Sequence, residues 1–415
     1  MEQKPKRVLN IGILSDSPFI TTGYRNQSIT IANLLGERGH NVYYFGSNYL
    51  GQNLKPGIEF DDGRKIKFST LGQGREAYFK DLLPIYTKQY NLDILFILLD
   101  TFMLYPWIMQ LDLSPAKVIF YYPSDGGGGM PLGCEQILKF VHCPVAMAQF
   151  GRNQVKKMYN IDCEHIPHAV DTNLFKPLPI EEKRKLRQMY GIRDDHYVVG
   201  TVARNQGRKM LDRTIKAFAL YAKKNPNALL FMHTDPDDAA QVFHMGSLIN
   251  RYGIMNRVIF SGMRYFKGFT DEQMNSVYNI MDVFILTTSG EGFGIPLIEA
   301  MSAGIPVLAT DYTTTREIVI KNKAGLGIAL AGDSTEENPD EHTIELLDGT
   351  LTGSWNVERG ICSIKDGASK LQVLENKDLR DELGKNGRYA AITIYDWKIN
   401  GQKWIELIEK LGGSL

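Results

Sequence analysis

Short runs of consecutive apolar residues recur along the chain and alternate with segments of helical periodicity. The first run covers residues 8–14, and a periodic segment over 27–38 leads to a second run at 42–45. A run that is apolar throughout is typical of a strand buried on both faces, as in a parallel sheet. The alternation therefore predicts a βαβ start and an α/β fold.

The same pattern continues and then begins again in the second half of the chain. Strands are predicted at 94–99 and 117–122, a charged helix and a turn cover 181–195, and a new α/β pattern starts at 197–203. The 415 residues are enough for two domains of ordinary size. We therefore predict two similar Rossmann-like domains. Their expected limits are 1–188 and 189–396, followed by an amphipathic helix over 397–415.

The segment before the last helix is less regular. Residues 333–361 are polar and show no clear period, so we expect a long loop or insertion there. Residues 368–383 and 386–394 have helical patterns, which predicts two helices separated near residue 384.

Composition narrows the class of protein. Hydrophobic residues make up 43% of the chain and charged residues 23%, as in a soluble globular protein. Lys+Arg and Asp+Glu both number 47, so no broad positive field for nucleic acid is indicated. The four cysteines lack C-x-x-C spacing, which argues against a thiolate metal site or a disulfide framework. The first apolar run is too short for a signal peptide or a membrane span, and we expect a cytoplasmic protein.

The segment 282–311 combines strand, glycine-rich loop, helix and strand. The strand 283–287 leads into the loop 289–294, a helix starts near Ile295, and Gly304 ends it before the next strand. Glycines let the backbone approach a ligand, and the first N–H groups of the helix lack intrahelical partners. This turn is therefore suited to a phosphate or a polar sugar.

Two glutamates accompany this turn. Glu291 lies in the loop and can reach a ligand at the helix tip, whereas Glu299 lies within the helix and can reach a ligand along its side. Taken alone, such a spacing more often arises by chance, as two solvated glutamates on a glycine-rich turn.

Two further turns carry candidate chemistry. Arg204, Arg208 and Lys209 follow the strand 197–203, where cations beside helical N–H groups could neutralise a diphosphate. Asp125 follows the strand 117–122 and precedes four glycines, at the end of a strand where open α/β sheets bind ligands. A solvated turn is the alternative interpretation for both.

The whole string around Glu291 resembles a known family. Ser-Gly-Glu-Gly-Phe-Gly at 289–294, Glu-Ala-Met-Ser-Ala-Gly-Ile-Pro-Val at 299–307 and Ala-Thr-Asp at 309–311 resemble the donor-site signature of retaining GT-B glycosyltransferases, family 4 in particular. The resemblance implies two Rossmann-like domains that face each other across a cleft, with the last helix packing back on the N-terminal, acceptor-side domain.

The resemblance also implies roles for individual residues. Catalytic roles are expected for Asp125, Arg204, Lys209 and Glu291. Donor-binding roles are expected for Gly23, Arg204, Lys209, Met263, Glu291, Gly292, Phe293, Gly294, Ile295 and Glu299. In the family, the Arg and Lys bind the donor's phosphates, which Arg204 and Lys209 match best, with Arg208 more ambiguous. Many family members carry a histidine near Asp125, and this chain has none there.

The implied activity is transfer of a hexose-type sugar from a UDP- or GDP-sugar to an unidentified acceptor, with retention, without a metal and without a further cofactor. The last helix is also compatible with contact at a membrane surface, although packing on the first domain is preferred. The alternatives are an epimerase or phosphorylase of the same fold, or a non-catalytic protein that binds sugar nucleotides. The absent histidine near Asp125 motivates the last of these.

Overall fold

The computed structural model divides into two compact units, and each is described by itself. The first unit comprises Met1–Ser124, Met130–Ala169 and Trp397–Leu415, and the second comprises Asp125–Gly129 and Val170–Asp396. The residues described are 5–20, 22–59, 65–264, 268–331, 344–346 (backbone only) and 357–413. The sequence analysis set the domain limit after residue 188, whereas the main segment of the second unit begins at Val170 and a short piece, Asp125–Gly129, also belongs to it.

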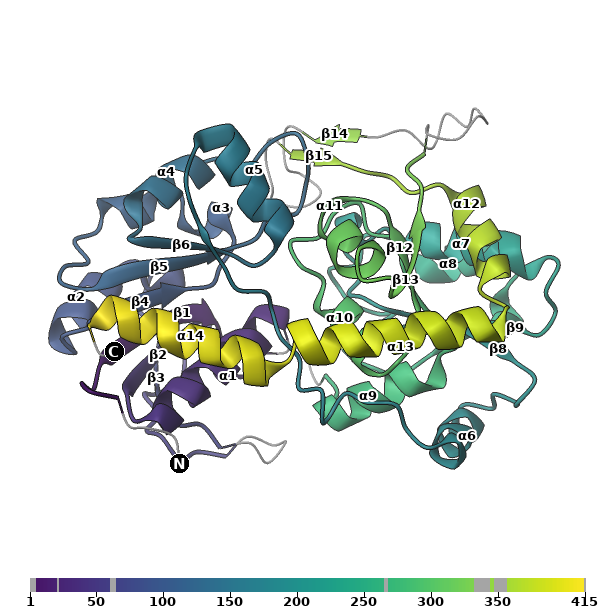
Figure 1. Cartoon of the computed structure of the whole chain (residues 1–415), viewed down its shortest axis with the longest axis horizontal. Helices are drawn as coiled ribbons and strands as arrows, with labels where there is room; N and C mark the ends of the chain where they lie inside the picture. The colour runs from purple at the N-terminus through teal and green to yellow at the C-terminus, as the bar shows by residue number, and fades with distance from the viewer. Residues whose placement is uncertain are drawn as a thin grey trace. The chain divides into compact units, whose positions relative to one another are not determined.

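The first unit is built on a parallel sheet of seven strands in the order β3-β2-β1-β4-β5-β6-β7 (Figure 1). Its strands are β1 Asn10–Asp16, β2 Asn41–Ser47, β3 Ser69–Leu71, β4 Ile94–Ile97, β5 Lys117–Tyr122, β6 Cys143–Ala146 and β7 Glu164–His165. The central strands are buried along most of their length, which explains why they appear as continuous apolar runs.

Helices connect these strands. They are α1 Gly23–Arg38, α2 Leu83–Gln89, α3 Thr101–Leu104, α4 Cys134–Phe140, α5 Gln149–Tyr159 and α14 Trp397–Gly412, with short 3-10 turns at Ala77–Phe79 and Trp107–Gln110. Helix α1 begins four residues before the start expected from periodicity, because the Thr22 side chain caps it by accepting a hydrogen bond from the Arg25 N–H (3.1 Å). Helix α14 packs on α1 and β4 within this unit.

The second unit repeats the plan with six parallel strands in the order β10-β9-β8-β11-β12-β13. These are β8 Tyr197–Val202, β9 Ala228–His233, β10 Val258–Phe260, β11 Val283–Leu286, β12 Val307–Thr310 and β13 Gly325–Ile328. A separate antiparallel ribbon joins β14 Ile344–Leu346 to β15 Val357–Arg359 (Figure 1). The rest of the expected insertion at 333–361 lies largely outside the described residues.

The helices of the second unit pack largely in pairs, such as α7 with α12 and α10 with α13. They are α6 Ile180–Met189, α7 Leu211–Ala222, α8 Met245–Arg251, α9 Asp271–Ile280, α10 Ile295–Ser302, α11 Thr313–Thr315, α12 Ile364–Val373 and α13 Lys377–Ile394, with 3-10 turns at Gly207–Lys209 and Met255–Arg257 and a π-turn at Arg316–Ile320.

The predicted break between the last two helices of this unit is wrong. The break lies between α12 and α13 at residues 374–376, and Gly384 lies inside α13. A side chain at Gly384 would collide with the carbonyl of Gly304, so the glycine serves close helix packing and does not end the helix.

Both sheets have a point where the strand order reverses. In the first unit the chain leaves β1 for β2 on one side, and later strands add from β4 on the other. In the second unit the same reversal falls between β8 and β11. Ligands of open α/β sheets bind outside the carboxyl ends of the strands at such points. The predicted α/β fold with two Rossmann-like sheets is thus confirmed, and it directs attention to the loops after β1, β4, β8 and β11.

Candidate functional site

Two loops leave the second unit's sheet at its point of reversal, residues 203–210 after β8 and residues 287–294 after β11. The Arg208 carbonyl accepts hydrogen bonds from the Ser289 N–H (2.7 Å) and the Thr288 hydroxyl (3.1 Å). These contacts hold the basic loop and the glycine-rich loop in register. Side chains from both can therefore act on one ligand.

The carboxylate of Glu291 is the centre of this assembly. Its side chain is 3% exposed, and it lies 2.5 Å from the Lys209 ammonium and 3.0 Å from the Arg208 guanidinium. Two cations thus share one carboxylate, which leaves the group with an excess of one positive charge. A buried charge of this kind is costly unless it is paired and hydrogen-bonded, which is the case for Glu291.

The charges of the group modify each other's proton affinity. Burial alone would raise the pKa of Glu291, but Arg208 and Lys209 outweigh it and lower the pKa to about 2. Burial and the neighbouring Arg208 lower the pKa of Lys209 to about 8, although Glu291 and Asp125 act in the opposite direction. Glu291 is therefore ionised and Lys209 mostly protonated at neutral pH, so the group keeps its positive excess.

Arg204, which the sequence analysis expected to bind phosphate beside Lys209, points to a different partner. Its guanidinium forms an ion pair with Asp238, with Nε 2.7 Å from Oδ2 and Nη2 3.3 Å from Oδ1. Arg208, which the sequence left ambiguous, accompanies Lys209 on Glu291 instead. The order of residues in a loop gives no side-chain directions, so the sequence could not separate these two arginines.

The backbone of the glycine-rich loop is tied down by threonines at the start of α11. The Glu291 N–H donates to the Thr313 hydroxyl (3.2 Å), and the Thr314 hydroxyl donates to the carbonyls of Glu291 (2.9 Å) and Gly292 (3.3 Å). The Phe293 side chain is buried, with its ring centroid 5.9 Å from that of Tyr395. The Phe293 ring therefore packs into the protein and anchors the loop.

The start of α10 follows directly. Gly294 has φ +94° and precedes Ile295, the first residue of the helix, so a residue with a Cβ would be strained at this position. Glu299 lies one turn further, and its carboxylate accepts a hydrogen bond from the Tyr278 hydroxyl (2.6 Å). Burial raises the pKa of Glu299 to about 7, against the opposing effect of that hydrogen bond.

Asp125 is held by an arginine that the sequence analysis missed. The Arg359 guanidinium, 1% exposed, lies 3.1 Å from the Asp125 carboxylate and also donates to the Asp125 carbonyl. Gly290 packs against the same carbonyl so closely that a Cβ there would collide with it. Arg359 lies in a three-residue strand inside a stretch without any period, which left no signal in the sequence.

Two further predicted residues lie outside these loops. Met263 follows β10, and its N–H donates to the Ser261 hydroxyl (3.4 Å), which in turn contacts His233 Nδ1 (2.9 Å). Gly23 belongs to the first unit, where it is the first residue of α1 rather than part of the preceding loop.

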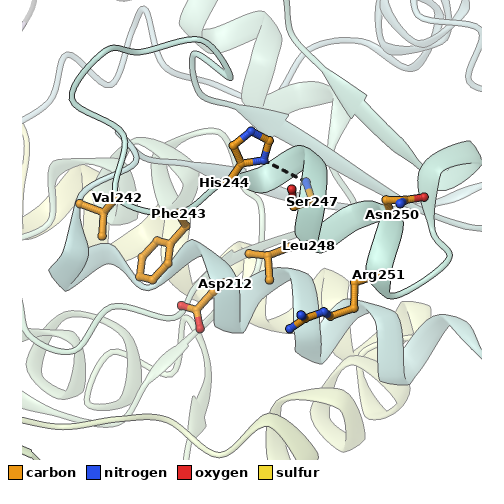
Figure 2. Close-up of a pocket in the computed structure, with 8 residues that line it drawn as sticks. All are labelled: Asp212, Val242, Phe243, His244, Ser247, Leu248, Asn250 and Arg251. Carbon is orange, nitrogen blue, oxygen red and sulfur yellow. Dashed lines mark hydrogen bonds between the residues drawn. The ribbon is translucent and has the colours of Figure 1, made fainter.

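A cavity of about 540 Å³ lies beside the 203–210 loop, between the start of α7 and helix α8 (Figure 2). It is lined by Asp212, Val242, Phe243, His244, Ser247, Leu248, Asn250 and Arg251. Asn205 ties its wall to the basic loop, because its side chain accepts from the Phe243 N–H (3.1 Å) and donates to the Phe243 carbonyl (2.6 Å). The cavity contains none of the predicted site residues.

Neither a metal-binding cluster nor a membrane-spanning helix occurs in the described part of the chain. No three His, Cys, Asp or Glu side chains there gather as a metal ion would require. No helix in that part is at once long and apolar enough to cross a membrane.

Part of the chain is similar to a known protein family. Residues 182–336 match the model of "Glycosyl transferases group 1". Mannosylfructose-phosphate synthase from Agrobacterium fabrum is 27% identical over 161 residues, which are 37% of this chain and 34% of that protein. The GDP-mannose-dependent alpha-(1-6)-phosphatidylinositol monomannoside mannosyltransferase from Mycolicibacterium smegmatis is 25% identical over 252 residues, 59% of this chain and 56% of that protein. The chain thus spans between a third and little more than half of the length of these relatives.

The fold is shared over a longer stretch. Sucrose-phosphate synthase from Thermosynechococcus elongatus superimposes with a TM-score of 0.73, covering 98% of this chain and all of that one, at 17% identity. The predicted resemblance to group 1 and the predicted GT-B fold are confirmed by these matches.

Proposed function

We propose that the protein transfers a sugar from a nucleoside-diphosphate sugar to an acceptor hydroxyl, on the premise that residues 182–336 match the model of the group 1 glycosyl transferases. The donor is bound by the loops 203–210 and 287–294 of the second unit. The acceptor belongs to the first unit.

The observation that supports this proposal most strongly is the pairing of Arg208 and Lys209 on the buried carboxylate of Glu291. The positive excess lies where the strand order reverses and beside the start of α10, whose N–H groups add partial positive charge. An anion such as a diphosphate fits this position. Glu291 can at the same time accept hydrogen bonds from sugar hydroxyls, as a carboxylate with several lone pairs allows.

The reaction follows from these charges. The acceptor oxygen forms a bond to the anomeric carbon while the bond from that carbon to the diphosphate oxygen breaks, and the acceptor proton leaves with the nucleoside diphosphate or to solvent. Negative charge grows on the departing diphosphate, so fixed cations stabilise the transition state more than the ground state. We propose that Arg208 and Lys209 supply this stabilisation, that no metal ion is needed for it, and that transfer proceeds with retention.

Glu299 is proposed to bind the ribose of the donor, since its side chain lies along the flank of α10 one turn beyond the glycine-rich loop. The neutral form favoured by burial could donate a hydrogen bond, and the ionised form accepts two. The relative from Mycolicibacterium is named as GDP-mannose-dependent, which makes GDP the first nucleotide to test beside UDP.

The direct test is thermal stability in the presence of UDP, GDP, ADP or GMP, one at a time. A ligand at about 100 times its dissociation constant stabilises by roughly 2.7 kcal/mol, which raises Tm by a few degrees. We expect a shift with one nucleoside diphosphate, lost in Glu299→Ala and kept in Glu382→Ala, an exposed glutamate of the same unit. If all four nucleotides leave Tm unchanged, the proposed donor site is wrong.

A non-catalytic protein that binds sugar nucleotides is the second candidate, and the ion pair between Asp125 and Arg359 favours it. The ion pair with the buried Arg359 gives Asp125 a structural role that needs no catalytic one. Assays of donor hydrolysis and of sugar transfer distinguish a transferase from a binding protein. We expect Asp125→Ala to lose sugar release while keeping the nucleotide-induced shift in Tm. If the parent and Asp125→Ala show the same background hydrolysis of the donor, a binding protein is favoured.

A further inference from the structure

The carboxylate of Glu299 is held by a tyrosine from a neighbouring helix of the second unit. Helix α9 packs against α10 (Figure 1), and the Tyr278 hydroxyl donates to Glu299 Oε2 at 2.6 Å. Helix α10 in turn follows the glycine-rich loop directly. The position of the Glu299 carboxylate beside this loop is therefore set by α9 as well as by its own helix.

The Tyr278 side chain has a fixed orientation. It is 0% exposed, and its ring makes edge contacts with Phe175 and Phe284 at centroid distances of 6.2 and 5.8 Å. A ring in a close-packed core of this kind keeps one orientation on average. Its hydroxyl thus points in one direction, and it holds Glu299 Oε2 in one place.

Helix α9 is itself anchored to the rest of the second unit. A capping box closes its first turn. Further along, Asn275 accepts a hydrogen bond from the Lys176 N–H (3.0 Å), and Asn279 accepts one from the Leu178 N–H (2.9 Å). These side chains lie within one turn of Tyr278, so the tyrosine is presented from a helix that is held at its start and near its end.

The two oxygens of the Glu299 carboxylate have different surroundings. Oε2 accepts from Tyr278, whereas Oε1 has no hydrogen-bond or ion-pair partner within the part of the chain that the structure describes. Glu299 is partly exposed, so a ligand can reach Oε1. One oxygen is thus held by the protein, and the lone pairs of the other are open to a donor from a ligand.

Tyr278 also favours the form of Glu299 that can accept such a donor. Burial raises the pKa of Glu299, the hydrogen bond from Tyr278 lowers it, and the charge of Asp271 at the start of α9 raises it. An ionised carboxylate accepts hydrogen bonds at both oxygens, whereas a protonated one carries a donor of its own. Without Tyr278 the carboxyl would be protonated over a wider range of pH.

We propose that Tyr278 is a positioning residue for the nucleotide of the donor: its hydroxyl holds Oε2 of Glu299, and Oε1 then accepts hydrogen bonds from the ribose hydroxyls. This inference rests on the proposed function, in which Glu299 binds ribose. Tyr278 has no exposed surface, so it acts through Glu299 and does not touch the donor. The arrangement makes the site selective for ribonucleotides over nucleotides that lack the ribose hydroxyls.

The test compares a nucleoside diphosphate with its 2′,3′-dideoxy form, which lacks both ribose hydroxyls. The nucleotide is whichever of UDP, GDP and ADP raises Tm of the parent, and affinities are measured by titration calorimetry. The parent should bind the ribonucleotide about tenfold or more tightly, as hydrogen bonds to a carboxylate allow. In Tyr278→Phe we expect the affinity for the ribonucleotide to fall about tenfold and that for the dideoxy form to stay within about twofold.

Tyr278→Phe retains the ring and removes only the hydroxyl, so the contacts in the core are kept. Tyr221→Phe is the matched control, because Tyr221 is also buried and its hydroxyl also donates to a glutamate, Glu375 (2.5 Å). Tyr221 lies near the end of α7 that is remote from the 203–210 loop. We expect Tyr221→Phe to leave both affinities unchanged, and Tm without nucleotide reports the stability of each variant.

The pH dependence gives a readout that a loss of packing would not move. The ratio of the two affinities cancels the titration of the phosphates and of Lys209, which both nucleotides share. In the parent this ratio should rise with pH around a midpoint near 7, because the pKa of Glu299 is about 7. In Tyr278→Phe the midpoint should move to higher pH, since the lost hydrogen bond lowers that pKa in the parent. A 4-aminophenylalanine at position 278, which keeps a donor on the ring, should restore the preference for the ribonucleotide.

Equal losses of affinity for both nucleotides in Tyr278→Phe, or an unchanged preference for the ribonucleotide, overturn the inference. Equal affinity of the parent for the ribonucleotide and the dideoxy form also overturns it, while nucleotide binding and the proposed function still stand. If the parent binds none of the nucleoside diphosphates, the proposed donor site itself is wrong. The two failures are thus distinguishable.

Discussion

At the scale of single residues, the three basic side chains of the 203–210 loop are not equivalent. Lys209 and Arg208 contact Glu291, whereas Arg204 is paired with Asp238. Hydrogen bonds to charged groups contribute about 1.5–3 kcal/mol each. We therefore expect Lys209→Ala and Arg208→Ala to weaken nucleoside-diphosphate binding by about 10–100-fold, measured by titration calorimetry.

Arg204→Ala is the matched control for these variants, because it removes a cation from the same loop but not from Glu291. We expect it to weaken binding less than either of the others. An Arg204→Ala variant that loses as much affinity as Lys209→Ala would show that Arg204 leaves Asp238 when the donor binds.

Glu299 gives the stability of the protein a predicted dependence on pH. Burial raises its pKa to about 7, from an ordinary value of 4.5 that the unfolded chain retains. The folded protein therefore holds a proton that the unfolded chain releases, and the resulting stabilisation is complete below pH 4.5 and lost as pH rises towards 7. Glu299→Gln cannot lose that proton, so its stability relative to the parent should rise over this window by on the order of 2–3 kcal/mol.

Denaturant unfolding at pH 5, 6, 7 and 8 measures this difference. Glu375→Gln is a suitable control, because Glu375 also accepts a hydrogen bond from a tyrosine, Tyr221, but is exposed. A difference between Glu299→Gln and the parent that stays constant from pH 5 to pH 8 would contradict the raised pKa.

At the scale of elements, the glycine-rich loop depends on a close approach of two backbones. Gly290 packs on the carbonyl of Asp125, and an alanine there would force the loop away and disturb the pair with Arg359. Overpacking of this kind costs about 1–3 kcal/mol. We expect Gly290→Ala to lower Tm by several degrees and to weaken nucleotide binding, as measured by thermal denaturation with and without nucleotide.

Gly246 offers the matching control within the same unit. It lies in α8, and an added Cβ would meet its nearest neighbour, a carbon of the His244 ring, only at 3.8 Å. Gly246→Ala should therefore stabilise by about 0.5–1 kcal/mol. A Gly290→Ala variant as stable as the parent would mean that the loop can move away from Asp125 without cost.

The hydrophobic pattern of the sequence was sufficient to place the buried strands. Strands such as β5 and β8 are apolar because both faces are buried, and their predicted positions agree with the structure to within one residue. The limits of helices depend on side-chain caps and on packing contacts, and neither is visible in the hydrophobic periodicity. Thr22 extends α1 towards the N-terminus, and Gly384 lies within α13 because that helix packs closely on the Gly304 backbone.

At the scale of the whole molecule, the plan of a parallel sheet with one reversal of strand order occurs twice. The glycine-rich signature around Glu291 pointed to the second unit, because local spacing encodes a loop and the helix after it. Contacts between distant segments left no such signal. Arg359 reaches Asp125, 234 residues away in the chain. Such a juxtaposition comes from the topology and not from any single stretch of sequence.

The two units also carry separate cores, and this leads to a prediction for the unfolding of the chain. Trp404 of α14 is buried, with its ring centroid 5.1 Å from that of Phe96 and 4.8 Å from that of Tyr121, and all three residues belong to the first unit. Truncating a buried tryptophan to alanine costs about 3–5 kcal/mol. We expect Trp404→Ala to lower a calorimetric transition of the first unit.

Nucleoside diphosphate should act on the other transition, because the proposed donor site lies in folded loops of the second unit and a ligand stabilises the folded unit that binds it. Calorimetry of the parent and of Trp404→Ala, each with and without nucleotide, therefore gives four curves in which substitution and ligand move different peaks. The four curves also assign each calorimetric peak to a unit. If the substitution and the nucleotide move the same single peak, the units unfold together, and the stability of the donor site then depends on the packing of α14 in the first unit.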